Sequence, residues 1–157
     1  MDESVVAPQS VLIIDDDRAL LSALVQSLQH LMPMRILSAE SAVAGLDIVN
    51  REHPTCVVVD VMLPGPSGKG MDGFQFVQII RGDPQTAATP VVFLTARAED
   101  INRFAGLAVG GDNYLVKPVP LKILVGAIEK AIATSDTERR QRLQRLAESE
   151  PPRSAHD

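Results

Sequence analysis

The sequence predicts an α/β domain built on a parallel β-sheet, and two alternating patterns predict it. Short apolar, mostly β-branched runs are typical of strands buried on both faces. They occur at residues 11–14, 35–37, 55–59, 90–94 and 113–116. Segments with helical spacing separate them, and breakers such as Pro33, Pro54 and Gly110-Gly111 mark the boundaries. Right-handed crossovers would then place helices on both faces of the sheet.

Each expected helix carries an apolar stripe that repeats about every 3.6 residues. The five stripes contain Leu20, Leu21, Leu24, Val25, Leu28 and Leu31; Val43, Leu46 and Val49; Phe74, Val77 and Ile80; Ile101, Phe104, Leu107 and Ala108; and Leu121, Leu124, Val125, Ile128 and Ile132. We therefore expect five amphipathic helices, each with one face buried.

Length and composition favour one folded domain. The chain has 157 residues, of which 45% are hydrophobic and 22% charged. The single cysteine, Cys56, excludes an intrachain disulfide and a cysteine-ligated zinc cluster. The net charge of −5 argues against a general nucleic-acid binder. No apolar run approaches the ~18 residues of a membrane span, and no signal peptide is visible, so we expect a cytoplasmic protein without membrane contact.

Composition also divides the chain into three parts. Residues 1–8 are expected to be a flexible N-terminus, and residues 9–133 the folded domain. Residues 134–157 are polar and rich in arginine, and they form a tail, part of it helical.

Acidic residues follow two of the expected strands. Asp15, Asp16 and Asp17 come directly after the first strand, and Asp60 follows the third. If these strands are neighbours, the carboxylates converge at the carboxyl edge of the sheet, where open α/β sheets bind ligands. Like charges at short range are unfavourable unless a cation joins them, and oxygen ligands suit Mg²⁺ or Mn²⁺. The alternative is that Asp16 or Asp17 caps the following helix.

Two further polar groups are expected at the same edge. Thr95 follows the fourth strand and Lys117 follows the fifth. A lysine ammonium can pair with the carboxylates or hold a phosphoryl oxygen, and a hydroxyl can donate a hydrogen bond to the same group.

Taken in order, the segments VLIIDDD, VVVDVMLPG, MDGF, VVFLTA and YLVKP resemble the receiver domain of bacterial two-component response regulators. The resemblance covers roughly residues 9–133. It implies a flavodoxin-like (βα)5 three-layer sandwich whose five-stranded parallel sheet has the order 2-1-3-4-5.

The resemblance also implies a phosphoryl-accepting site. Asp60 matches the phosphoacceptor, and Asp16 matches the direct Mg²⁺ ligand. Asp15 matches the acid that holds the metal through water, and the backbone carbonyl of Met62 matches another ligand. These assignments make the chain a signalling domain, not an enzyme with a separate substrate.

Three more positions acquire roles from the resemblance. Lys117 matches the lysine that pairs with the phosphoryl group, and the Lys117–Pro118 bond is usually cis in the family. Thr95 matches the switch hydroxyl and Tyr114 the switch aromatic. Asp17 matches no family role, so we interpret it as a helix cap or a surface charge.

The implied function is that of a stand-alone receiver phosphorylated by a sensor histidine kinase. Its output would go to a downstream protein or a histidine phosphotransfer protein, without direct contact to nucleic acid. A homodimer could form through the fourth helix, fifth strand and fifth helix, or through the tail. The alternative is a degenerate receiver that serves as an interaction module. A dehalogenase-like phosphatase would need an acid at Met62.

The loop after Asp60 departs from the family pattern. Pro64 lies where the family places proline, but the matching glycine, Gly73, comes five residues late. The extra residues are roughly 66–70. They could affect access to the site, or they could be a tolerated surface insertion, because added loop length costs little stability.

Overall fold

A computed structural model describes residues 8–63, 71–97 and 113–134, together with residues 138, 141, 144 and 145. Strands and helices alternate along the chain. The elements are β1 (Ser10–Ile14), α1 (Arg18–Leu31), β2 (Arg35–Ala39), α2 (Ala42–Glu52), β3 (Cys56–Asp60), α3 (Gly73–Gly82), β4 (Val91–Thr95), β5 (Asn113–Val116) and α5 (Leu121–Ala133). The helix expected over residues 101–108 and the insertion at 66–70 lie outside the described residues.

The sheet has five parallel strands in the order β2-β1-β3-β4-β5, which confirms the predicted topology. In the register, Val11 of β1 lies between Ile36 of β2 and Cys56 of β3. Every residue of β1, β3 and β4 is buried. Apart from one polar end residue in each (Ser10, Asp60 and Thr95), these strands are apolar, because helices cover both faces of the sheet.

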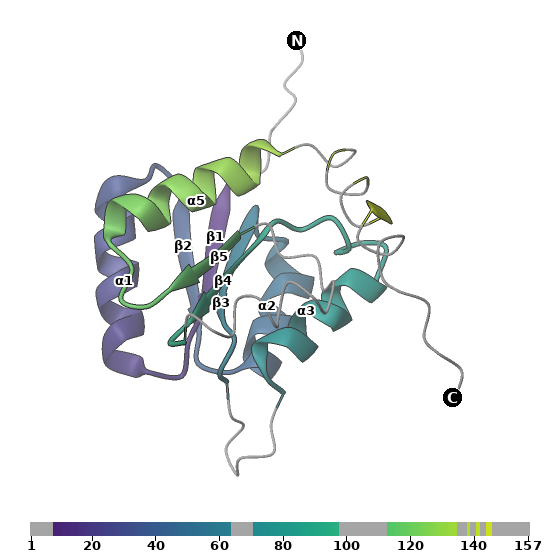
Figure 1. Ribbon diagram of the computed structural model, residues 1–157, viewed down its shortest axis with the longest axis horizontal. Coiled ribbons are helices and arrows are strands. Elements are labelled where there is room, and N and C mark those ends of the chain that lie inside the picture. Colours follow the sequence, from purple (N-terminus) through teal and green to yellow (C-terminus); the bar gives the residue numbers. More distant parts are fainter. Residues whose placement is uncertain are drawn as a thin grey trace.

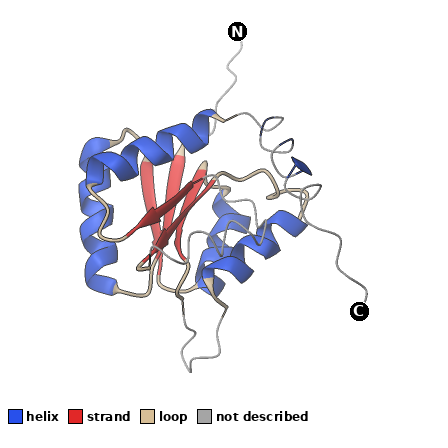
Figure 2. Ribbon diagram, viewed as in Figure 1, coloured by secondary structure: helices blue, strands red, loops and turns tan. Residues whose placement is uncertain are grey.

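The helices form the two outer layers of the sandwich, as Figures 1 and 2 show. On one face, α1 and α5 pack over a core that includes Leu28, Val58 and Ile128. On the other face, α2 and α3 pack over a core that includes Val59 and Phe76. Aliphatic side chains dominate both cores, in keeping with the scarcity of aromatic residues, which make up 3% of the chain.

Side chains cap the starts of three helices: Asp17 caps α1, Ser41 caps α2 and Asp72 caps α3. The carboxylate of Asp17 accepts a hydrogen bond from the backbone N–H of Leu20 at 3.1 Å, so Asp17 caps α1. At α3, Asp72 and Gln75 form a reciprocal capping box. Our interpretation of Asp17 as a helix cap is confirmed. Asp16 is not the N-cap of α1.

Among the described residues of the predicted apolar stripes, two are exposed to solvent. Leu31 is 54% exposed and Val43 is 66% exposed. Leu31 is the last residue of α1 and Val43 the second residue of α2, so both stand at helix ends, away from the centre of the sheet. Among the described residues, no helix is long and apolar enough to span a membrane.

Candidate phosphoryl-accepting site

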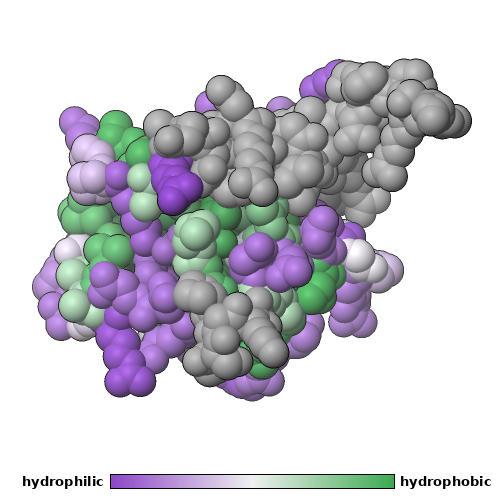
Figure 3. Space-filling model, turned by 60° about the horizontal axis from the view of Figure 1, so that its bottom comes forward, coloured by the Kyte–Doolittle hydropathy of each residue, from purple (hydrophilic) through white to green (hydrophobic). Residues whose placement is uncertain are grey.

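Four strands deliver polar residues to one edge of the sheet. Asp60 is the last residue of β3 and pairs with Leu94 of β4, so Thr95 lies one residue further along the same edge. Thr95 in turn pairs with Val116 of β5, which brings Lys117 to that edge. Asp15 directly follows β1. Figure 3 brings this side of the molecule forward and shows hydrophilic side chains between smaller hydrophobic patches on its described part.

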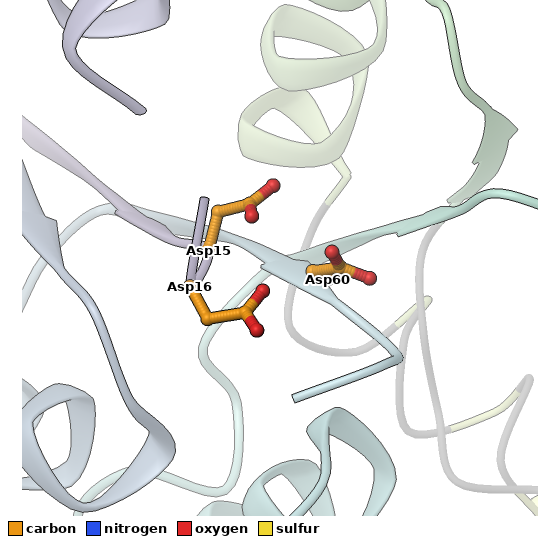
Figure 4. Close-up of side chains that lie close together, drawn as sticks. All are labelled: Asp15, Asp16 and Asp60. Atoms are coloured by element: carbon orange, nitrogen blue, oxygen red, sulfur yellow. The ribbon is translucent and has the colours of Figure 1, made fainter. Parts of the chain in front are cut away.

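Three carboxylates gather at this edge. Asp15, Asp16 and Asp60 each offer an oxygen, and these oxygens lie within 4.8 Å of one another. Figure 4 shows Asp15 and Asp16 at the end of β1 and Asp60 at the end of β3. Asp15 is fully buried and Asp60 is 5% exposed, whereas Asp16 is exposed. The cluster therefore has two buried carboxylates and one that faces solvent.

Lys117 joins the two buried carboxylates. Its Nζ donates to Oδ2 of Asp15 and to Oδ2 of Asp60, both at 2.7 Å. The lysine is 102 residues from Asp15 and 57 from Asp60 in the sequence. The short distances are those of charge-assisted hydrogen bonds. Lys117 is itself positioned by its backbone N–H, which donates to the carbonyl of Thr95 at 2.7 Å.

Backbone N–H groups hold the other oxygen of each buried carboxylate. The N–H of Asp17 donates to Oδ1 of Asp15, and the N–H of Met62 donates to Oδ1 of Asp60, both at 2.9 Å. Each carboxylate thus has one oxygen on a backbone donor and one on Lys117. This arrangement fixes the direction of both side chains at the site.

Burial and pairing shift two pKa values in this cluster. Burial raises the pKa of Asp60, and it outweighs the hydrogen bonds from Lys117 and Met62, which act in the opposite direction. Burial by itself would lower the pKa of Lys117, but the hydrogen bonds and charges of Asp15 and Asp60 outweigh it and raise that pKa. Lys117 therefore stays protonated at neutral pH, and ionisation of Asp60 is unfavourable because its carboxylate is shielded from water.

The donor set fits a divalent metal ion. With all three acids ionised, the single positive charge of Lys117 leaves two negative charges uncompensated at the edge of the sheet. Carboxylate oxygens are the hard ligands that Mg²⁺ and Mn²⁺ prefer. The exposed carboxylate of Asp16 is open to an ion from solvent, whereas Asp15 and Asp60 each have one oxygen engaged by Lys117.

The two expected switch residues lie on neighbouring strands. Thr95 is 1% exposed, and its hydroxyl accepts a hydrogen bond from the backbone N–H of Arg97 at 3.2 Å. The ring of Tyr114 stacks on Phe93, with centroids 5.3 Å apart and planes at 13°. Tyr114 thus packs against the core beneath α2 and α3. The Lys117–Pro118 peptide bond is cis, as the family resemblance implied.

Gly73 contributes to the site in a way that sequence reasoning missed. A Cβ atom at Gly73 would lie 2.3 Å from the carbonyl oxygen of Asp60 and 2.9 Å from Cα of Val61. The N–H of Gly73 also donates to the carbonyl of Val61 at 3.0 Å. The start of α3 is therefore in direct contact with the end of β3, although the insertion separates them in the chain. The D-x-x-Q capping signature at Asp72 was the available clue to where α3 begins.

A flavodoxin-like sheet with acids and a lysine at its carboxyl edge defines a class of doubly wound domains whose sites lie at a switch in strand order. Comparison with known protein families shows which family of this class the chain belongs to. The model of the response regulator receiver domain matches residues 11–129. The chain therefore belongs to the receiver domain family of two-component response regulators.

Curated relatives agree with this family. The transcriptional regulatory protein AfsQ1 of Streptomyces coelicolor is 37% identical over 129 residues, which cover 82% of this chain and 53% of AfsQ1. The response regulator MprA of a Mycobacterium species is 35% identical over 118 residues, covering 75% of this chain and 48% of MprA. The chain thus spans about half the length of the curated relatives it matches.

Solved structures show the same fold. The chemotaxis protein CheY4 of Vibrio cholerae superimposes with a TM-score of 0.70 at 26% identity, covering 80% of this chain and 99% of CheY4. A response regulator from Chloroflexus aurantiacus gives a TM-score of 0.69 at 27% identity, covering 80% of this chain and 98% of that chain. The strand order found here is therefore that of CheY-like receivers.

Proposed function

We propose that this receiver accepts a phosphoryl group on Asp60 and thereby switches its contacts with other proteins. The observation that supports it best is the double bridge of Lys117 to Asp15 and Asp60, with both Nζ–Oδ2 distances at 2.7 Å. The ammonium of Lys117 contacts Asp60, and the exposed carboxylate of Asp16 lies in the same cluster. The donor would be a phosphohistidine of a sensor histidine kinase or a small acyl phosphate.

The reaction is an in-line displacement at phosphorus. A carboxylate oxygen of Asp60 forms the new O–P bond while the bond from phosphorus to the donor's nitrogen or oxygen breaks, and the donor leaves with that bonding pair. Catalysis of such a loose transition state is mainly positioning and charge neutralisation. The N–H of Met62 orients the carboxylate of Asp60, and the ammonium of Lys117 stabilises negative charge on the transferring group.

We propose that Asp15, Asp16, Asp60 and the backbone carbonyl of Met62 hold a Mg²⁺ or Mn²⁺ ion at this site. When bound, the ion offsets the repulsion between carboxylate and phosphoryl oxygens. The exposed Asp16 would bind it directly, and Asp15 through water. The two uncompensated negative charges of the cluster support a divalent ion over a monovalent one.

The switch is proposed to involve Thr95 and Tyr114. Thr95 would turn its hydroxyl from the backbone of Arg97 toward a phosphoryl oxygen, and Tyr114 would move into the space that Thr95 leaves. Thr95 already lies one residue beyond Asp60 on the adjacent strand, which supports this role. The surface formed by the expected fourth helix, β5 and α5 would change with these two residues. A few kcal/mol of differential stability suffices for such a population shift.

Receiver domains work with sensor histidine kinases, and we propose that this receiver is cytoplasmic and that its partner is a sensor histidine kinase. The sequence alone suggested a stand-alone receiver whose output goes to a downstream protein or a histidine phosphotransfer protein, without nucleic acid. Several matched relatives are named transcriptional regulatory proteins and are about twice as long. Our proposal therefore concerns the phosphorylation of the receiver by the kinase.

Acetyl phosphate tests the proposal directly. The protein is incubated with acetyl phosphate, with and without Mg²⁺, beside Asp60→Asn, and the intact masses are measured. We expect one phosphoryl adduct that requires Mg²⁺ and is absent from the variant. An adduct that persists in Asp60→Asn would move the acceptor elsewhere. No adduct with acetyl phosphate or with phosphorylated kinases would favour the alternative, an interaction module that has kept the fold without the chemistry.

A further inference from the structure

Three aromatic rings form a continuous row from α3 through β4 to β5. The ring centroids of Phe74 and Phe93 lie 5.4 Å apart, with the planes at 54°. Those of Phe93 and Tyr114 lie 5.3 Å apart, with the planes at 13°. Both distances are in the range of favourable aromatic pairs. The chain has only four phenylalanines and one tyrosine, so most of its aromatic residues lie in this row.

The middle ring of the row is held more firmly than the ring at its end. Phe93 is fully buried, and Phe74 is 7% exposed. Gly73, the neighbour of Phe74, abuts the backbone of Asp60, so the start of α3 is fixed against the end of β3. Tyr114 is only half-buried and lies on the edge strand β5. The ring of Phe93 is therefore a fixed surface, and Tyr114 is the ring that can leave it.

The strand register places this stack beside the proposed switch. Tyr114 pairs with Phe93 in the register of β4 and β5. Thr95 lies two residues after Phe93, so both side chains point to the same face of β4, about 6.6 Å apart along the strand. A ring stacked on Phe93 must therefore move along β4 to reach the space beside Thr95. The two places are alternative positions of the Tyr114 ring.

The stack accompanies the arrangement of Thr95 that precedes the proposed switch. In this structure the hydroxyl of Thr95 still accepts the hydrogen bond from the N–H of Arg97, while Tyr114 stacks on Phe93. An aromatic pair adds to the energy of apolar burial alone and changes an equilibrium roughly two- to tenfold. The contact with Phe93 therefore favours the resting position of Tyr114.

We propose that Phe93 is a positioning residue of the switch. Its ring holds Tyr114 in the resting position and opposes the movement of Tyr114 toward Thr95 until a phosphoryl group is bound. Phe74 supports Phe93 from the side of α3. The inference rests on the proposed function, because it takes Thr95 and Tyr114 as the switch residues. It adds the contact that sets how readily the switch responds.

Tyr114 is its own reporter for the first test. The chain has one tyrosine and no tryptophan, so the tyrosine band in near-ultraviolet circular dichroism comes from Tyr114. We expect this band to lose most of its intensity in unphosphorylated Phe93→Leu, because the ring loses its fixed neighbour. Phe76→Leu is the matched control and should keep the band. Phe76 is also fully buried in the same core, but its ring lies beside Gly45 of α2.

Beryllium fluoride, an inorganic mimic of the phosphoryl group, gives the second test. It is titrated into the full chain with Mg²⁺ present, and calorimetry gives the apparent dissociation constant. We expect this constant to fall roughly two- to tenfold in Phe93→Leu, because the stack no longer opposes the switched state. A merely structural role of Phe93 would leave the binding unchanged or weaken it. In a Tyr114→Leu background, Phe93→Leu should have no further effect, since no ring remains to be held.

Phe93→Ile is a second substitution that suits a strand, and it should give the same results if Phe93→Leu does not fold. An unchanged tyrosine band in a folded Phe93 variant would overturn the proposal, as would unchanged or weaker binding of beryllium fluoride. Equal tightening in Phe76→Leu would also contradict it, because a looser core would then explain the effect. A wild type that binds no beryllium fluoride would contradict the proposed function. A band lost only in the Phe93 variants would then still support the hold of Phe93 on Tyr114.

Discussion

Gly73 touches the backbone of Asp60, with room for a hydrogen atom but not for a methyl group. A Cβ at Gly73 would come within 2.3 Å of the Asp60 carbonyl oxygen, which is backbone and cannot rotate away. The chain between these residues is longer than the family pattern by five residues, yet α3 still begins against the end of β3. The extra length is therefore accommodated between Val61 and Gly73 without separating the two elements.

Gly73→Ala should damage both stability and phosphorylation. Overpacking costs about 1–3 kcal/mol, and we expect the upper part of that range, because the clash is with backbone. Urea unfolding gives the loss, and the acetyl phosphate reaction should slow, because the end of β3 must shift. Gly82→Ala, at the last residue of the same helix, meets nothing within 4 Å and is the control. Equal stability of both variants would show that the contact is not rigid.

Lys117→Met should destabilise the protein in the absence of divalent metal. It leaves Asp15 and Asp60 buried side by side without their shared cation. Removing one partner of a fully buried ion pair costs about 3–5 kcal/mol, and we expect about 1–3 kcal/mol because Lys117 is partly exposed. Chemical denaturation measures the change. Lys122→Met, an exposed lysine on α5, should stay within about 0.5 kcal/mol of wild type. A comparable loss in both variants would count against the bridge.

Mg²⁺ should raise the melting temperature of the wild type. An ion that binds only the folded state adds about 2.7 kcal/mol at one hundred times its dissociation constant. Asp16→Ala should lose most of this rise, because Asp16 is the exposed acid of the cluster. Asp47→Ala removes a surface carboxylate that pairs with Arg51, and the rise should persist there. If Asp16→Ala keeps the full rise, the ion binds elsewhere.

The raised pKa of Asp60 predicts a pH-dependent advantage of Asp60→Asn. Below the ordinary value of 3.8, Asp60 is protonated in both the folded and unfolded states. As pH rises through the raised folded pKa, the wild type loses stability relative to the variant, because the buried carboxylate must ionise. We expect Asp60→Asn to be more stable at pH 7 without metal, with a gap that narrows as pH falls toward 3.8. Unfolding of both proteins across this range checks it, and a gap that widens on acidification would mean a lowered pKa.

The strands and the candidate site residues were largely predictable from local pattern. The apolar runs ending at Asp15 and Asp60 predicted buried parallel strands, and β1 and β3 are buried and adjacent. Leu31 and Val43 were assigned to buried stripes wrongly, because periodicity does not say how far a helix extends beyond the sheet. The strand order came from the family resemblance, since periodicity alone does not order strands.

The sequence by itself determined the alternation of strands and helices, the acids at strand ends and the membership in the receiver family, because hydrophobic periodicity and motif order are local properties. Only the tertiary structure decided that Lys117 bridges Asp15 and Asp60 at 2.7 Å and that Gly73 abuts the Asp60 backbone. These contacts join residues far apart in the chain or depend on which side of a helix faces the sheet. They are set by crossover connections and by packing, which no local pattern contains.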